Sequence, residues 1–131
     1  MDDMGIVVDD LDEAVAFFEI LGMELEGRGM VEGEWVDRIT ELGDQQIEIA
    51  MLRTPHGHGR LEMSRFLSPA VVSDHREAPV NALGYLRVMF PVDDLDSTLG
   101  RLSEVGGILV GDVVHFEDVY RLCYLRGPGR S

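Results

Sequence analysis

The chain has 131 residues, of which 45% are hydrophobic and 27% are charged, as is typical of a soluble globular protein with one core or two small fused modules. Its 25 acidic and 11 basic residues give a formal net charge of −14, which argues against nucleic-acid binding because an acidic surface repels phosphate backbones. The sequence contains no apolar run of the roughly 20 residues that a membrane-spanning helix needs.

The beginning of the chain and its cysteine content bear on the compartment. The first residues show no basic segment followed by an apolar stretch, so we expect no secretory signal. Cys123 is the single cysteine, which fits a reducing compartment. We therefore expect a cytoplasmic protein. The acidic residues are spread along the chain, which is typical of a solvated surface but would also attract a cationic ligand.

An internal repeat organises the sequence. The segment Val8–Asp12 recurs as Val92–Asp96, at an offset of 84 residues. Gly22, Leu25 and Gly27 are also identical to the residues 84 positions further on. A repeat of this length indicates two copies of one structural unit.

Each copy of the repeated segment opens a predicted amphipathic helix of about three turns. Asp10 and Asp94 stand at the N-cap positions, and Gly22 and Gly106 stand where a left-handed residue would end each helix. The apolar faces consist of Leu11, Ala14, Val15, Phe18 and Leu21 in the first copy and Leu95, Thr98, Leu99, Leu102 and Val105 in the second.

Strand signals surround both helices. Short apolar strands are expected before the helices, at Met4–Val8 and Val88–Val92. Further strands are expected at Met23–Arg28, around Trp35–Thr40, and at Gln46–Leu52, Leu61–Phe66, Ile108–Val110, Val113–Phe116 and Tyr120–Arg126. The order predicts an α+β fold of two tandem βαβββ-type modules, residues 1–66 and 84–131, joined by a linker over 67–83. These modules would form a cupped mixed sheet with the helices outside, the second module being short of its last strand.

With these motifs the chain resembles the vicinal-oxygen-chelate superfamily of glyoxalases, bleomycin resistance proteins and dioxygenases. The segments that carry the resemblance are Met4–Asp12, Leu21–Met23, Arg60–Met63, Arg87–Asp96 and Tyr120–Pro128. The resemblance implies a homodimer with a small-molecule ligand in the cup. It also implies one divalent metal ion (Mg, Mn, Fe or Zn), held by residues of the first and last strand of each module. An enzyme of this kind would be a metal-dependent lyase, isomerase or dioxygenase that activates a bidentate oxygen substrate.

Carried over residue by residue, the resemblance implies a reduced ligand set. Asp3 stands where the family often has His, and Glu62 stands in the last strand of the first module, so these two are the candidate metal ligands. Glu62 is also the candidate catalytic residue. Arg87 occupies the position equivalent to Asp3, and the position of the fourth ligand falls after residue 129. Strand alternation places Asp3 and Glu62 on one face, toward the cup.

Three further residues are candidates for substrate binding. Arg87 would face the cup from the second module and anchor a carboxylate, or else it is an exposed charge at a strand end. His115 lies in a predicted strand and Trp35 could line an apolar pocket, although both also fit structural positions. Three functions stay open: a metal-dependent enzyme, a metal-free protein that sequesters a drug or metabolite, and a non-catalytic interaction module that uses an open sheet edge.

Overall fold

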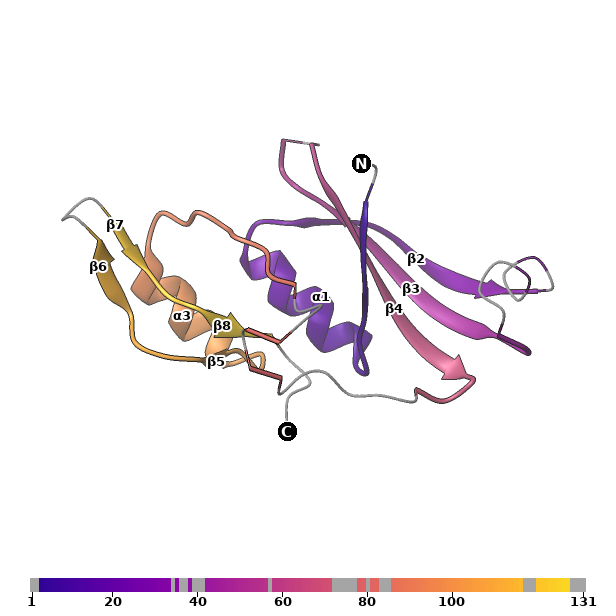
Figure 1. Ribbon diagram of the computed structural model, residues 1–131. Helices are drawn as coiled ribbons and strands as arrows, with labels where there is room; N and C mark the ends of the chain where they lie inside the picture. The colour runs from indigo at the N-terminus through magenta and orange to yellow at the C-terminus, as the bar shows by residue number, and fades with distance from the viewer. Residues whose placement is uncertain are drawn as a thin grey trace.

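The computed structural model describes residues 3–33, 35, 38, 42–56, 58–71, 78–79, 81–82, 86–116 and 120–127 (Figure 1). The first half contains β1 (Met4–Val7), α1 (Leu11–Ile20), β2 (Glu24–Glu32), β3 (Gln46–Arg53) and β4 (Arg60–Ser68). The second half contains α3 (Leu95–Ser103), β5 (Ile108–Leu109), β6 (Val114–Phe116), β7 (Tyr120–Leu122) and β8 (Leu125–Arg126).

The first half forms a four-stranded mixed sheet in the order β1-β4-β3-β2. Strand β1 runs parallel to β4, and the other neighbours are antiparallel. The second half forms two-stranded sheets, β5 with β8 and β6 with β7. Helices α1 and α3 lie side by side between the four-stranded sheet and the small sheets (Figure 1). The prediction of an α+β fold with a mixed sheet is confirmed, and the sheets of the described residues do not close into one.

Both helices begin and end as their sequences predict. The side chain of Asp10 accepts a hydrogen bond from the backbone N–H of Glu13 at 3.0 Å, and that of Asp94 accepts one from Ser97 at 3.0 Å. These caps satisfy N–H groups that have no partner inside the helix. Gly22 after α1 has φ 96°, and Gly106 after α3 has φ 91°. Only glycine adopts this conformation without strain, which explains the glycine at each helix end.

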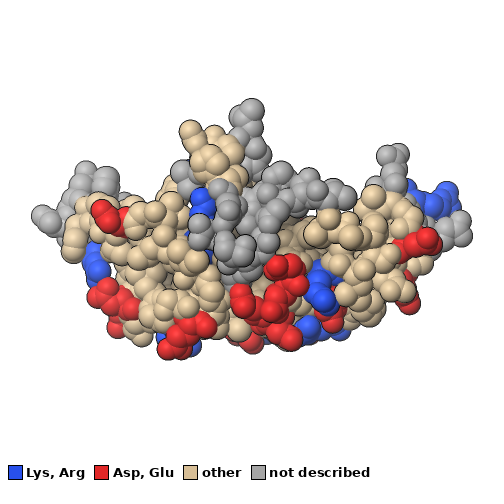
Figure 2. Space-filling model, turned by 90° about the horizontal axis from the view of Figure 1, so that it is seen from below, with Lys and Arg blue, Asp and Glu red and all other residues tan. Residues whose placement is uncertain are grey.

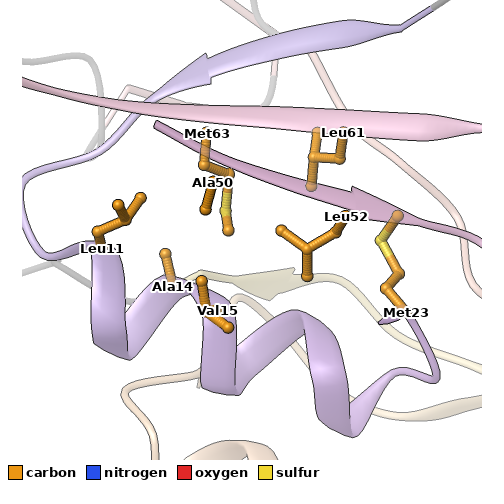
Figure 3. Close-up of a cluster of buried hydrophobic side chains, with 8 residues drawn as sticks. All are labelled: Leu11, Ala14, Val15, Met23, Ala50, Leu52, Leu61 and Met63. Atoms are coloured by element: carbon orange, nitrogen blue, oxygen red, sulfur yellow. The ribbon is translucent and has the colours of Figure 1, made fainter. Parts of the chain in front are cut away.

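One face of the four-stranded sheet is covered by α1. The buried cluster between them consists of Leu11, Ala14, Val15, Met23, Ala50, Leu52, Leu61 and Met63 (Figure 3). Leu52 and Met63 are 0% exposed. Fully burying side chains of this size contributes about 1.5–3 kcal/mol each. In the part of the chain that the structure describes, no helix packs on the opposite face of this sheet.

The two halves of the chain meet where α1 packs against the second half. The rings of Phe18 in α1 and Phe90 have centroids 6.1 Å apart. Gly107 is buried nearby, and a Cβ atom there would lie 3.0 Å from the carbonyl oxygen of Leu102, 3.1 Å from Phe17 Cε2 and 3.2 Å from a methyl group of Leu125. A glycine therefore permits the close approach of the two halves.

Two predicted strands differ from the structure. Val88–Val92 forms no strand, although its first-half counterpart is β1. The physical reason is pairing: β1 has β4 beside it, whereas the described part of the second half places no strand next to 88–92. In the stretch around 35–40, Trp35 and Arg38 have helical backbone, so the strand prediction is wrong there, and the other residues of that stretch lie outside the described ones. Neither described helix has the length and hydrophobicity to cross a membrane.

Candidate ligand site

The uncovered face of the four-stranded sheet is the candidate site, and strand alternation decides which side chains it carries. Leu61 and Met63 point into the core under α1, so Glu62 between them points to the open face. Across the strands, Glu62 stands opposite Gly5 on β1 and Met51 on β3.

The next strands extend this row across the sheet. Met51 is paired in turn with Gly27 on β2. A second row, one step along the strands, contains Val7, Ser64, Ile49 and Gly29. The open face therefore carries Met51 and Ile49 beside Glu62 and Ser64 on its two central strands, and glycines along its β2 edge.

A hollow of about 370 Å³ lies on this face toward the β2 edge. It is lined by Glu26, Gly27, Arg28, Gly29, Ile49, Met51 and Arg60. A Cβ atom at Gly27 or Gly29 would meet nothing within 4 Å, so the space above these glycines is open. Ile49 and Met51 supply an apolar floor. The volume falls within the range of small-molecule sites, roughly 300–1,000 Å³.

The charges around the hollow are mostly paired. Arg53 contacts Glu24 at 2.9 Å, and Arg60 contacts Glu26 at 2.9 Å. Both pairs are solvent-accessible, so they neutralise charge more than they stabilise the fold. Glu62 is half-buried and makes no hydrogen bond or ion pair with any other described residue. The centre of the open face therefore carries one unpaired carboxylate.

A separate ionic network holds the helix side of the sheet. Arg28 on β2 bonds Asp12 in the first turn of α1 and also contacts Glu48 on β3 at 3.8 Å. Arg65 on β4 contacts Glu48 at 3.5 Å and donates from Nε to the carbonyl oxygen of Asp9 at 3.1 Å. The hydrogen bond with Asp12 raises the pKa of Arg28 further above its ordinary value, so Arg28 stays charged. This network fixes α1 on the covered face and leaves the open face free.

The two predicted metal ligands lie on the same sheet. Asp3 is exposed and immediately precedes β1. Because Met4 pairs with Leu61, extending the register places Asp3 beside Arg60, one row away from Glu62. Both carboxylates thus belong to the open face, as alternation predicts, and their role as ligands stays a prediction.

The three predicted substrate-binding residues lie elsewhere. The guanidinium carbon of Arg87 is 5.7 Å from the centre of the Tyr124 ring, a cation–π contact within the second half. His115 is exposed on β6, paired with Arg121 on β7. Trp35 is 60% exposed. None of the three lines the hollow on the open face.

The described donors do not fit the full metal site that the resemblance implies. No group of three or more His, Cys, Asp or Glu side chains in the described ranges could hold a metal ion. Asp3 and Glu62 supply two carboxylates in neighbouring rows. A divalent ion held by these residues would need water or substrate for most of its coordination positions.

Sequence reasoning identified none of the residues that line the hollow as site residues. Ile49 and Met51 alternate with the core residues Ala50 and Leu52, so the two faces of β3 are both apolar and periodicity does not distinguish them. Gly27 and Gly29 carry a weak signal, since two glycines spaced by two in a strand leave a bare patch on one face.

The wider surface has both signs of charge. Figure 2 shows acidic and basic side chains gathered along one long edge of the face that it presents, with uncharged residues over much of the rest. The acidic residues dominate the total, in keeping with the net charge of −14.

The capped helices and the four-stranded mixed sheet with α1 on one face define an α+β fold. Comparison with known proteins identifies the family. Residues 2–124 match the family model of the Glyoxalase/Bleomycin resistance protein/Dioxygenase superfamily, and the chain belongs to that family. A solved structure of a glyoxalase family protein from Bacillus cereus is 60% identical, with a TM-score of 0.91. The match covers 97% of this chain and 85% of that one. No curated protein matches.

Proposed function

We propose that this protein binds a small organic molecule with a positively charged group on the open face of the β1-β4-β3-β2 sheet. The observation that carries the proposal is Glu62, a half-buried carboxylate without a partner among the described residues, next to the apolar floor of Ile49 and Met51. Partly buried charges favour a partner, because burial costs free energy unless the charge is compensated. A cation with an apolar body satisfies both features of the face.

The surrounding charges support this ligand class. Arg53 and Arg60 are each paired with a glutamate, and Arg28 at the hollow is paired with Asp12, so these arginines are already neutralised. The net charge of −14 further disfavours anionic ligands. A cation would gain a charge-assisted hydrogen bond with Glu62, a contact of about 1.5–3 kcal/mol, or roughly ten- to a hundred-fold in Kd.

Three compounds of similar shape and different charge test the proposal. Binding of 2-phenylethylamine, 2-phenylethanol and phenylacetate is measured by calorimetry on the wild type, Glu62→Gln and Glu19→Gln. Glu19 is an exposed residue of α1 on the opposite side of the sheet and serves as the control. The amine is expected to bind tightest, and Glu62→Gln alone should remove its advantage over the alcohol. Equal binding of amine and alcohol by the wild type would contradict the proposal.

A metal-dependent lyase, isomerase or dioxygenase is the alternative function, since its candidate ligands Asp3 and Glu62 share the open face. Elemental analysis of protein purified without chelator distinguishes it. If the wild type contains about one equivalent of divalent metal and Glu62→Gln contains none, the protein is a metal-dependent enzyme and the proposal of direct cation binding is wrong. If Glu62 binds the organic cation directly, we expect no divalent metal in either protein.

We also propose that the protein is a homodimer in the cytoplasm. Among the described residues, β1 and β2 each pair on one side only, and in the second half Leu86 is 73% exposed and Met89 is 91% exposed. Open strand edges and exposed apolar residues each favour association with another chain. Sedimentation of a monomer alone at micromolar concentration would contradict this proposal.

A further inference from the structure

The second half of the chain contains a hollow at the position that repeats the first. This second hollow, about 250 Å³, is lined by Val110, Gly111, Asp112, Val114, Leu122, Cys123 and Tyr124. Its first three residues stand 84 positions after Glu26, Gly27 and Arg28, which line the hollow on the open face. The two hollows thus share one repeated segment, 26–28 and 110–112, and differ in their other lining residues.

Both hollows lie at an irregularity in a strand ladder. In the first half, the register of β2 and β3 shifts between Leu25 and Gly27. In the second half, Val110 donates a backbone hydrogen bond to Tyr124 at 3.0 Å, and Val114 pairs with Leu122.

Three residues, 111–113, therefore face the single residue Cys123 on the other strand. Residues 111–113 make no hydrogen bond with any other described residue, so their backbone groups are available to a ligand.

The lining of the second hollow contains one charged residue, Asp112, whereas that of the first contains Glu26, Arg28 and Arg60. Val110, Val114, Leu122 and Tyr124 surround it, each between 42% and 51% exposed. Burial is the main influence on the Cys123 thiol and raises its pKa, so the thiol is uncharged at neutral pH. Asp112 is thus the one charged side chain among the described residues that line the hollow.

The charged groups nearby select against ionic ligands. Arg121 is occupied by a two-point contact with Asp96, at 2.8 and 3.1 Å. The Tyr124 ring already faces the guanidinium of Arg87, so a cationic ligand would compete with this contact. Asp112 is an exposed residue that lines the hollow, and its carboxylate disfavours an anion.

We propose that this second hollow binds a small uncharged ring compound, independently of the open face of the four-stranded sheet. An apolar cavity of roughly 150 Å³ accommodates benzene, so a hollow of 250 Å³ has room for a two-ring molecule. Apolar contact with the valine and leucine side chains holds the rings. The backbone groups of residues 111–113 bond a hydroxyl group of the ligand.

Cys123 makes the test local, because it is the single cysteine of the chain and lines the hollow. The rate of its alkylation by iodoacetamide is measured with and without 2-naphthol. At a probe concentration ten times its Kd, about one molecule in eleven is unoccupied, so the rate should fall about ten-fold. The same measurement is made on Val114→Glu, which places a charge in the hollow, and on Val88→Glu.

Val88 is the matched control, 48% exposed against 51% for Val114, and it does not line the hollow. Protection should disappear in Val114→Glu and persist in Val88→Glu. If circular dichroism shows that Val114→Glu is unfolded, Leu122→Glu is used instead, because Leu122 is another exposed residue that lines the hollow. An unchanged rate in wild type up to the solubility limit of 2-naphthol would overturn the proposal, as would equal protection of all variants. Neither result depends on Glu62 or on binding of 2-phenylethylamine.

Discussion

Gly107 is the position where the packing of the two halves can be tested most sharply by a single methyl group. The Cβ of Gly107→Ala would meet a backbone oxygen, an aromatic carbon and a methyl carbon at 3.0–3.2 Å, closer than normal van der Waals contact. The nearest of these atoms, the carbonyl oxygen of Leu102, also accepts the hydrogen bond of the Gly107 N–H at 2.9 Å, so it cannot move away freely. Overpacking of this kind costs about 1–3 kcal/mol.

Gly100→Ala is the control with the opposite expected sign. Gly100 lies within α3, and a Cβ there meets nothing within 4 Å. Alanine is favoured over glycine inside a helix by about 0.8–1 kcal/mol. Urea unfolding measures both effects: at a slope of about 2 kcal/mol per molar, Gly107→Ala lowers the midpoint by roughly 0.5–1.5 M, whereas Gly100→Ala raises it. A Gly107→Ala protein as stable as wild type would refute the close packing at this junction.

Two further predictions concern the core and the surface. Leu52→Ala should destabilise the protein by about 3–4 kcal/mol because Leu52 is fully buried. Its partner on β2, Leu25, is 39% exposed, so Leu25→Ala should cost about 1 kcal/mol. Similar urea midpoints for the two variants would contradict this prediction. The hydrogen bond from Arg121 lowers the pKa of Asp96 below its ordinary 3.8, so the pair stabilises the fold above about pH 4 and loses this effect as the pH falls through the depressed pKa. Asp96→Asn should therefore have a lower urea unfolding midpoint than wild type at pH 7 and the same midpoint in acid. Asp93→Asn, at an exposed position, is the control. A difference in midpoint that does not change with pH, or an equal decrease in Asp93→Asn, would refute the pairing.

The repeat carries most of what could be predicted about the fold. Local signals determine the helix ends: Asp10 and Asp94 bond the N–H groups that their spacing predicts, and Gly22 and Gly106 adopt positive φ. These features depend on residues within one turn, so a single sequence is enough to find them.

The segment Val88–Val92 shows where local signals fail. Its residues repeat those of β1, yet a strand exists only if another strand lies alongside, and the described part of the second half provides none. Pairing depends on distant parts of the chain, which the composition of one segment does not reveal.

The candidate site was predictable in part for the same reason. Alternation with Leu61 and Met63 is enough to place Glu62 on the open face. The hollow beside it is made by residues from β2, β3 and β4, and its lining residue Glu26 is paired with Arg60, 34 positions away in sequence. Such pairings depend on the register of three strands, including the shift at Glu26, and not on a local pattern.

The central claim is that the open face of the four-stranded sheet binds a cationic small molecule at Glu62. The most direct test is a titration of 15N-labelled protein with 2-phenylethylamine, followed by the amide shifts of β1, β3 and β4. The account predicts saturable shifts centred on Gly5, Met51 and Glu62 that disappear in Glu62→Gln. No saturable shifts, or shifts confined to other parts of the chain, would contradict it.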